Sequence, residues 1–228
     1  GTLFEGTKLG FSGGGIFKTT DGGINWRPVF DDQPELSIGD ITYDPSNPNI
    51  VYAGTGDPNV PSVVFNGNGI YKSTDAGESW SYLGLGQQGI ISKVLVDPGN
   101  SQTLFAAVMG NPYVRDEQRG IYKSTDGGAN WTRLAATSSW QHVNDIVIST
   151  LNSQRVVAAT NNGIWVSNNA GSTFVRQLTA NNCSDLAMTV LGGAEVWLGA
   201  CGVPTAQATA YRSTDTLTWS PVLSEAAM

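Results

Sequence analysis

The sequence predicts an all-β protein, a β-propeller built of four-stranded antiparallel blades. Three observations support this prediction: an eight-residue motif recurs along the chain, strand-like runs lie between its copies, and turn-forming residues are abundant. The 228 residues include 28 Gly and 10 Pro, while only 14% are charged. A chain of this length can bury about 70% of its unfolded surface, so it can form a sizeable core.

The recurring motif organises the whole chain. It reads TTDGGINW at residues 19–26, STDAGESW at 73–80 and STDGGANW at 124–131, with weaker copies SNNAGSTF at 167–174 and STDTLTW at 213–219. The acidic or amide residue and the ring residue of the copies are Asp21 and Trp26, Asp75 and Trp80, Asp126 and Trp131, Asn169 and Phe174, and Asp215 and Trp219. Successive Asp or Asn residues lie 54, 51, 43 and 46 positions apart, which is the length of one propeller blade.

Apolar and β-branched runs between the copies predict four strands, A to D, in each blade. We expect these strands at residues 38–44, 50–55, 69–73 and 80–84; 91–97, 103–109, 120–124 and 131–135; 143–149, 155–160, 163–167 and 174–178; 184–190, 194–201, 209–213 and 219–223. Residues 15–30 supply only strands C and D of an earlier blade. Residues 1–228 are therefore expected to form one partial propeller, with blades at about 15–30 (half), 38–85, 91–136, 143–179 and 184–224.

The repeated octet has a structural interpretation. Its Asp can accept hydrogen bonds from the free N–H groups of a short turn between strands C and D, and its Gly tolerates a positive φ. The ring residue begins strand D, where it can pack between neighbouring blades. A row of sugar-stacking rings is the alternative, and packing is the simpler explanation for a ring at one repeat position.

The octet resembles the Asp-box, or BNR repeat, of sialidase-type, xyloglucanase-type, sortilin-type and photosystem-assembly propellers. Residues 38–57, with GNGIYKSTD at 67–75 and RGIYKSTD at 119–126, are similar to the sortilin (VPS10) N-terminal-like propellers of large secreted bacterial proteins, often labelled glycosyl hydrolases. The resemblance covers residues 15–179 well and 180–228 loosely. It implies that further blades of the same chain, or a partner subunit, complete the propeller.

The resemblance does not assign a complete set of catalytic residues to positions of this sequence. Sialidases of this type need an arginine triad, a Tyr nucleophile with a Glu partner and an Asp acid, none of which can be located here. Xyloglucanases of this type use two Asp residues from two propellers, of which a partial propeller holds at most one. Asp57, Asp116 and Glu117 are the candidate catalytic carboxylates. Asp57 and Asp116 could serve as acid and base if their carboxyl groups lay about 5 to 9 Å apart.

Strand order predicts where ligands bind. The A–B and C–D turns lie on one face of an antiparallel blade, and the longer B–C and D–A loops lie on the other, where function is expected. Candidate ligand-binding residues in or near these loops are Asn59, Phe65, Asn66, Tyr113, Arg115, Arg119, Trp140 and His142. This mixture of groups could bind a sugar or a peptide terminus. Alternatively, the charges at 115–119 are solvated and pair with one another, and His142 is packed.

Composition argues against several other classes. The formal net charge of −7 has the wrong sign for nucleic acid, and no run approaches the ~20 apolar residues of a membrane span. One His and two Cys cannot build a closed zinc site, and the glycine-rich residues 10–15 lack the Lys and helix of a phosphate-binding loop. We expect no metal and no cofactor. Because the chain opens at Gly1 without a Met or a leader, we expect it to be mature, trimmed or cut from a longer protein.

The two cysteines predict a disulfide. If Leu191-Gly192-Gly193 joins strands A and B of the last blade, Val190 faces Ala194 and the same register places Cys183 opposite Cys201. A bond between them requires an oxidising compartment. A pair of reduced core thiols is the alternative. With the resemblance, the pairing predicts a secreted or cell-surface protein, or one of a periplasm or organelle lumen.

Three functions fit these observations. The leading hypothesis is a secreted or cell-surface scaffold that binds a protein or glycan through its long loops, because no catalytic set is assembled. The first alternative is a xyloglucanase- or sialidase-like glycoside hydrolase acting on polysaccharide. The second is an assembly or structural component of a larger extracellular complex, which predicts an unpaired sheet edge at residues 15–20.

Overall fold

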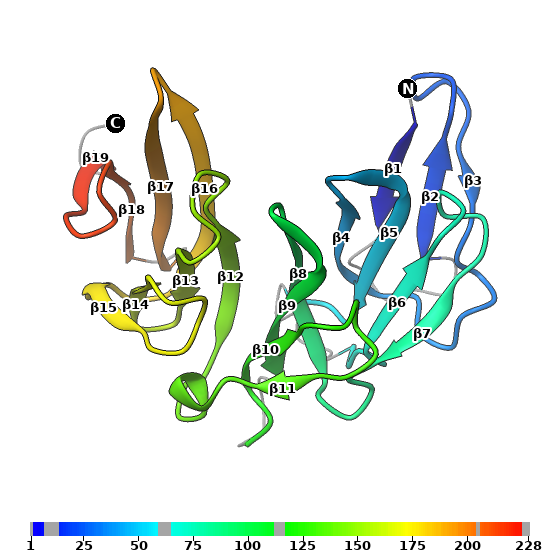
Figure 1. Cartoon of the computed structure of the whole chain (residues 1–228), viewed down its shortest axis with the longest axis horizontal. Helices are drawn as coiled ribbons and strands as arrows, with labels where there is room; N and C mark the ends of the chain where they lie inside the picture. The colour runs from blue at the N-terminus through cyan, green and yellow to red at the C-terminus, as the bar shows by residue number, and fades with distance from the viewer. Residues whose placement is uncertain (1, 7–13, 59–64, 112–116, 204–205, 225–228) are drawn as a thin grey trace.

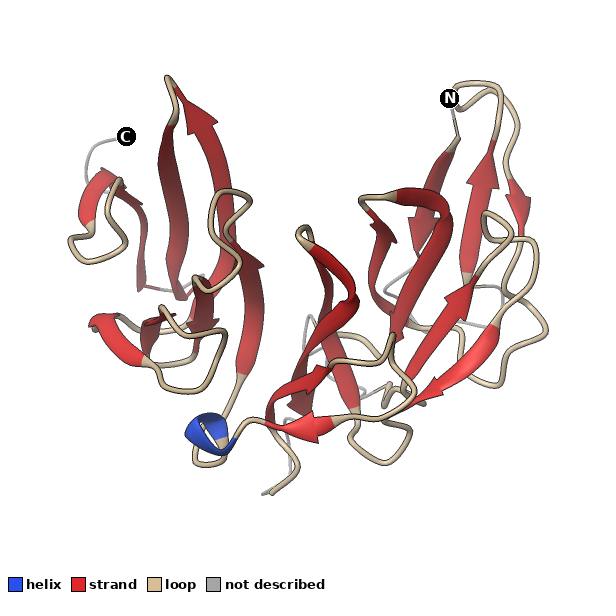
Figure 2. Cartoon of the chain, in the orientation of Figure 1, coloured by secondary structure: helices blue, strands red, loops and turns tan. Residues whose placement is uncertain are grey.

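The computed structural model describes residues 2–6, 14–58, 65–111, 117–203 and 206–224. In these segments 19 strands form five antiparallel sheets, and one short 3₁₀ helix, η1 (Ala135–Thr137), accompanies them. The sheets follow one another along an arc, with the first and last sheets at its two ends (Figure 1). Figure 2 shows that strands and loops make up nearly all of the drawing. Among the described residues no helix is long and apolar enough to cross a membrane.

Each sheet is a run of consecutive strands, and the strands that come first in sheets two to five contact one another along the arc. The first sheet consists of β1 (Leu3–Gly6), β2 (Ile16–Thr19) and β3 (Arg27–Pro28). The second and third are β4 (Ile38–Asp44), β5 (Asn47–Thr55), β6 (Ile70–Ser73) and β7 (Ser81–Gly84), then β8 (Ile90–Asp97), β9 (Asn100–Gly110), β10 (Gly120–Ser124) and β11 (Thr132–Arg133). The fourth and fifth are β12 (Val143–Ile148), β13 (Val156–Thr160), β14 (Gly163–Ser167) and β15 (Val175–Leu178), then β16 (Cys183–Leu191), β17 (Ala194–Val203), β18 (Ala206–Ser213) and β19 (Ser220–Ser224).

The all-β prediction with four-stranded antiparallel blades is confirmed, with one difference at the start of the chain. The segment Leu3–Gly6 forms β1, which pairs with β2 and places Phe4 opposite Lys18. The first sheet therefore has three described strands, where the sequence predicted two. The unpaired edge expected at residues 15–20 is wrong, because β2 lies between β1 and β3.

The octets form the turns between the last two strands of each sheet, and their Asp or Asn side chains hold those turns. In the second blade, the carboxylate of Asp75 accepts the N–H groups of Glu78 and Ser79 at 3.0 and 2.9 Å. The hydroxyl of Ser73 donates to Asp75 and accepts the N–H of Gly77. The hydroxyl and then the N–H of Ser79 hold the pKa of Asp75 well below its ordinary value. This Asp is therefore occupied by turn geometry.

The core is divided among the sheet-to-sheet interfaces. One apolar cluster fills each of the four spaces between successive sheets, as with Ile16 and Phe30 against Ile38 and Tyr71. The octet rings contribute at these interfaces: Trp80 packs edge-on against Phe30 of the preceding sheet, with ring centroids 5.2 Å apart. Repeated sheets that bury their faces against neighbours are the basis of a propeller.

The last sheet contains the disulfide but not the predicted turn. Gly192 and Gly193, with φ of 59° and 84°, form a two-residue hairpin, so Leu191 rather than Val190 lies opposite Ala194. A register shift between Cys183 and Asp185 then returns Cys183 to a position opposite Cys201. The two sulfur atoms are bonded at 2.04 Å. Two positive-φ glycines favour the tighter turn, because its twist matches that of the strands.

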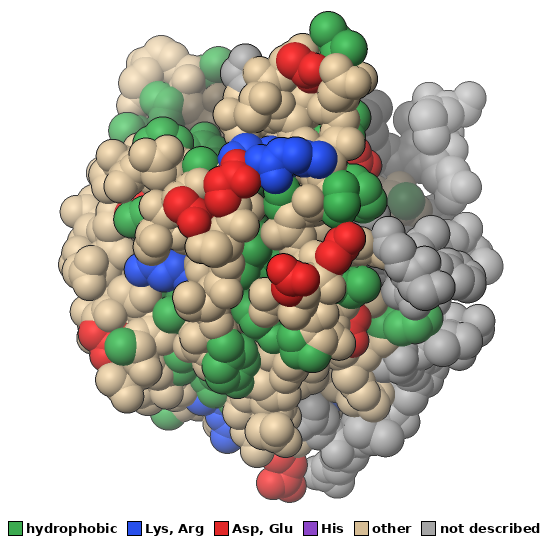
Figure 3. Space-filling model, turned by 90° about the vertical axis from the view of Figure 1, so that its right-hand side faces the viewer, with side chains coloured by type: hydrophobic (Ala, Val, Ile, Leu, Met, Phe, Trp, Pro, Cys, Tyr) green, Lys and Arg blue, Asp and Glu red, His purple; other side chains and the backbone are tan. Residues whose placement is uncertain are grey.

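Charges of both signs lie together at the end of the arc formed by the first sheets. Figure 3 views the molecule from this side and shows acidic side chains beside basic ones among many uncharged groups. Lys18 of β2 and Arg27 of β3 both pair with the carboxylate of Glu78. The described part of this surface therefore offers no broad single-sign patch of the kind that attracts polyanions.

Candidate functional site

The two faces of the arc differ as the strand order predicts. On the first face the turns between first and second strands meet, and Ser101 donates to Asp44 of the preceding blade at 2.7 Å. On the opposite face, the loop before β12 meets the turn between β13 and β14. There Asn161 donates to Gln141 at 2.9 Å. This second face carries the longer connections, and we call it the long-loop face.

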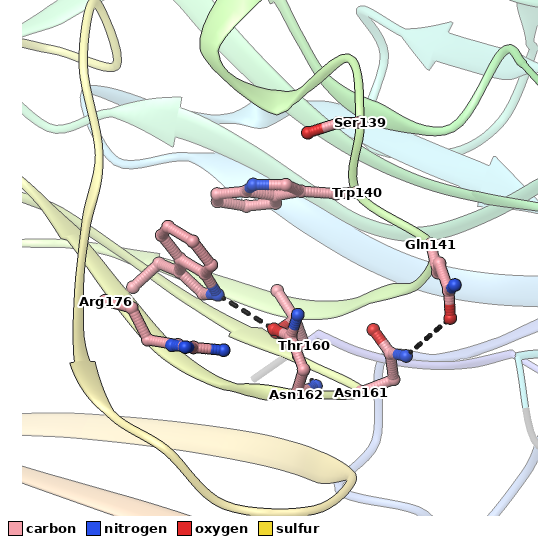
Figure 4. Close-up of a pocket in the computed structure, with 8 residues that line it drawn as sticks. Ser139, Trp140, Gln141, Thr160, Asn161, Asn162 and Arg176 are labelled. Atoms are coloured by element: carbon pink, nitrogen blue, oxygen red, sulfur yellow. Dashed lines mark hydrogen bonds between the residues drawn. The ribbon is translucent and has the colours of Figure 1, made fainter.

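A pocket of about 460 Å³ opens on the long-loop face of the fourth blade. Two short segments and one residue from each of two further strands form it, so no continuous stretch of sequence encodes it. Its lining residues are Ser139, Trp140 and Gln141 before β12, Thr160 at the end of β13, Asn161 and Asn162 in the turn that follows, Trp165 on β14 and Arg176 on β15. Figure 4 shows Trp140 lying across this space from Asn162 and Arg176.

Aromatic rings form one wall of the pocket. The ring centroids of Trp140 and Trp165 are 5.1 Å apart at a tilt of 39°, and Phe174 packs edge-on against Trp140. The guanidinium of Arg176 lies over the ring of Trp165 at 5.5 Å. The indole N–H of Trp165 donates to the side-chain oxygen of Asn162 at 3.0 Å. These contacts hold the rings in fixed positions.

Local backbone structure positions the pocket residues. The N–H of Trp140 donates to the carbonyl of Thr137, the last residue of η1, at 3.1 Å. Thr137 is itself fully buried and accepts the N–H of Ile121. Gly163 ends the tight turn after Asn162 at a φ of 137°, and a Cβ there would collide with the carbonyl of Leu178. The turn therefore needs glycine at this position.

The chemistry of the pocket suits binding. Its lining offers two indole rings, a guanidinium, three amides and two hydroxyls, and it includes no carboxylate. Such a wall can cover a flat apolar surface, and the amides and hydroxyls can exchange hydrogen bonds with hydroxyl groups. General acid–base hydrolysis needs a pair of carboxyl groups, which these eight residues do not supply.

The predicted site residues lie in different places in the structure. Asn59, Tyr113, Arg115 and Asp116 lie outside the described residues. Of the remaining catalytic candidates, Asp57 is fully buried, with its N–H donating to the carbonyl of Phe65, and Glu117 is exposed. Trp140 is the candidate that lines the pocket.

The other described candidates lie elsewhere on the long loops. Arg119 is buried and donates to the carbonyl of Asn111. His142 is half-buried, and burial followed by the charge of Arg119 lowers its pKa. Asn66 is exposed, next to the half-buried Phe65. The sequence-based prediction places Arg176 only inside the expected strand 174–178 and does not single out the turn at Asn161 and Asn162, because it seeks binding residues in the long loops.

A charged cluster lies on the innermost strands, close to the long-loop face. The amine of Lys93 on β8 is 3.3 Å from Asp40 on β4 and 3.9 Å from Asp145 on β12. Burial raises the pKa of Asp145 to about 7, and Asp185 adds to this while Lys93 opposes it. Burial opposes the charged form of Lys93, but Asp40 and Asp145 outweigh it and raise that pKa.

Replacing Asp145 by Asn should flatten the pH dependence of stability. A carboxyl whose pKa is higher in the folded state than its ordinary 3.8 gives stability that is complete below about pH 4 and lost as pH rises to about 7. His142 acts in the opposite sense, and the variant retains it. Between pH 5 and 8 the wild type should therefore lose about 2 kcal/mol more than Asp145→Asn in urea titrations. Parallel curves would contradict this, and the exposed Asp32→Asn is the matched control.

Among the described residues no group of three or more His, Cys, Asp or Glu side chains is placed to hold a metal ion.

Several xyloglucanases are similar in sequence to this chain, although no family model matches it. A xyloglucanase of Hypocrea jecorina is 31% identical over 108 residues, covering 43% of this chain and 12% of that enzyme. A xyloglucanase of Paenibacillus sp is 28% identical over 144 residues, covering 53% of this chain and 13% of that enzyme. The chain thus spans only a small part of the length of the enzymes it matches.

Solved structures show the fold. A GH74 enzyme of Niastella koreensis superposes with a TM-score of 0.72 at 21% identity, over 96% of this chain and 35% of that one. The GH74 xyloglucanase of Xanthomonas campestris gives 0.72 at 16%, over 97% of this chain and 36% of that one. The class defined by fold and neighbours is a β-propeller, present here as a partial one. Within that class the chain is similar to xyloglucanases, and the narrower sortilin-type resemblance remains a prediction.

Proposed function

We propose that this chain is a segment of a secreted glycoside hydrolase acting on a polysaccharide of the xyloglucan class, and that its pocket on the fourth blade holds the glycan. The observation that carries the proposal is the Trp140–Trp165 wall facing amides and hydroxyls on the long-loop face. The similarity to xyloglucanases favours this hydrolase alternative over the leading sequence-based hypothesis of a binding scaffold. It does not support the expectation that the protein is not an enzyme.

A sugar ring suits this wall because one of its faces is formed by C–H groups and its rim by hydroxyls. The indole of Trp140 can cover the C–H face, since aromatic rings bury large apolar areas with little loss of conformational freedom. Gln141, Asn161 and Asn162 can then donate to and accept from the rim. Their mutual hydrogen bonds, Asn161 with Gln141 and Trp165 with Asn162, hold these groups ready for a ligand.

The chemical step is expected to need carboxylates beyond this pocket. Asp57 is enclosed by the protein and Glu117 lies on the surface, and neither of them lines the pocket. We therefore assign the described part of the chain to holding substrate. The acid and the base would come from residues 59–64 and 112–116, which lie outside the described residues, or from another part of the enzyme.

Replacing Trp140 by Ala should weaken binding of xyloglucan oligosaccharides about tenfold or more, which corresponds to about 1.4 kcal/mol. Isothermal titration calorimetry on the whole chain measures this. Trp26→Ala is the matched control, because Trp26 is also partly exposed but lies in an octet turn on the other face. The proposal is overturned if the wild type fails to bind these oligosaccharides, or if Trp140→Ala binds them as tightly as the wild type.

A further inference from the structure

A recurring lysine contact links the first blade to the second and the third blade to the fourth. In the first sheet Lys18 lies over the ring of Phe4, its cross-strand neighbour, at 5.7 Å. Its amine donates to the carbonyl of Ala76 in the octet of the second blade at 2.6 Å. The third blade repeats the arrangement toward the fourth with Lys123, Phe105 and Ala170, at 5.0 and 3.2 Å. The lysine directly precedes the octet in both cases.

The octet glycine seats the side chain that lies beneath the lysine. A Cβ added to Gly77 of the second blade would be 2.6 Å from the ring of Phe4. In the fourth blade, a Cβ on Gly171 would collide with Leu134 of the preceding blade at 2.5 Å and would touch the ring of Phe105 at an ordinary contact distance of 3.6 Å. In both blades the octet glycine therefore makes room for side chains of the preceding blade, beside its role in the turn.

The innermost strands carry a second recurring contact. The carboxylate of Asp40 accepts the N–H of Val94 in the next blade at 3.0 Å. The carboxylate of Asp145 accepts the N–H of Leu186 in the next blade at 2.8 Å. Each Asp directly follows a register shift near the start of its strand, which turns its side chain toward the following blade.

The fifth blade carries the same contact set on its outer face. Arg212 directly precedes the octet, its cross-strand neighbour is Leu198, and Asp185 follows the register shift of β16. Here the residues are uncovered. Leu198 is 45% exposed, whereas Phe105 and Val157 at the same position of the third and fourth blades are 1% and 0% exposed. Ala200 is also exposed, whereas its equivalents Ala107 and Ala159 are fully buried.

We propose that this outer face, defined by Asp185, Leu198, Ala200 and Arg212 and here called the terminal face, binds one further octet-bearing blade. Arg212 would donate to the carbonyl after the octet Asp, and Leu198 would pack on the octet glycine. Asp185 would accept an N–H of the incoming innermost strand. All three contacts repeat those seen between blades of the structure. They require the bound blade to present a main-chain carbonyl and a glycine in its octet, and a main-chain N–H on its innermost strand. The inference is independent of the glycan proposal.

The test extends the whole chain at Met228 with a copy of its residues 138–179, which contain the fourth blade and its octet. The extended chain should show a thermal midpoint about 5 °C higher, with slow amide exchange in the added strands. Arg212→Glu and Asp185→Lys should each remove most of that gain while leaving the unextended chain nearly unchanged. A copy carrying Gly171→Leu should lose it too, because the seat for Leu198 is filled.

Three results would overturn the proposal. The first is an extended chain with an unchanged midpoint and rapidly exchanging added amides. The second is a gain that survives both charge reversals. The third is self-association of the unextended wild type at micromolar concentration in sedimentation experiments that Arg212→Glu abolishes, because the occupant would then be a second copy of this chain.

Discussion

Glu195→Gln should lower the free energy of unfolding by about 3 kcal/mol at pH 7, since it neutralises one member of a buried charged network. The carboxylate is 6% exposed. It accepts from Arg155 at 2.6 Å and from the indole N–H of Trp197 at 3.1 Å, and the hydroxyl of Ser149 also donates to it. Ser149 and Arg155 belong to the fourth blade, so the network joins the last two sheets. The amide of Gln cannot satisfy all three donors.

The loss should depend on pH in a defined direction. Burial alone would raise the pKa of Glu195, but the hydrogen bonds from Ser149, Arg155 and Trp197 outweigh it and leave the pKa below its ordinary value. A carboxyl of lowered pKa gives stability that is present above its ordinary pKa and lost as pH falls through its folded pKa. The difference between wild type and variant in urea titrations should therefore shrink below about pH 4.5. An equal difference at pH 3 and pH 7 would contradict this account, and the exposed Glu117→Gln is the control.

The double variant Cys183→Ser, Cys201→Ser should be less stable by about 3 kcal/mol. The bond closes a loop with a sequence separation of 18 residues, and in the chain-entropy model it restricts the unfolded chain by about this amount. For a protein of this size the thermal midpoint should fall by roughly 6 to 12 °C. Differential scanning calorimetry measures the fall.

Two further measurements separate loss of the bond from loss of packing. Wild type treated with a reductant should approach the midpoint of the double variant, and the variant itself should not respond to the reductant. Titration of unreduced, denatured wild type should find no free thiol. Two titratable thiols would contradict the disulfide and would remove the main support for an oxidising compartment.

The fold could be predicted from the sequence because the spacing of the octets gives the blade length and their residues predict a tight turn. The strand register was predicted less well, because it depends on backbone irregularities. Register shifts near the starts of the innermost strands, next to Gly39, Ser92, Asn144 and Ser184, break the two-residue period, so strand pairing cannot be extrapolated from one end. The predicted disulfide pairing is nevertheless found, because the register shift near Ser184 compensates for a turn that is one residue shorter than expected.

The candidate site was less accessible. Trp140 was predicted because it lies in a connection on the long-loop face, but its pocket partners come from a two-residue turn and from two strands. Asn161 and Asn162 look like ordinary turn formers, and Arg176 looks like a solvated strand residue. Only the packing of β14 and β15 beside η1 brings these side chains to Trp140, and a single sequence does not encode that proximity in any local pattern.

The packing of each sheet on the next also governs how the molecule unfolds. Because apolar side chains fill all four spaces between sheets, as where Phe4 packs on Gly77 and Leu134 on Gly171, each sheet shares part of its stability with its neighbours, much as stacked units do in a one-dimensional lattice. Among the five described sheets, the second, third and fourth are each packed between two others, and the first and the last contact one. Melting should then proceed as fraying from the ends of the arc inward, and the pocket on the fourth blade would be separated from the nearer end by a single sheet.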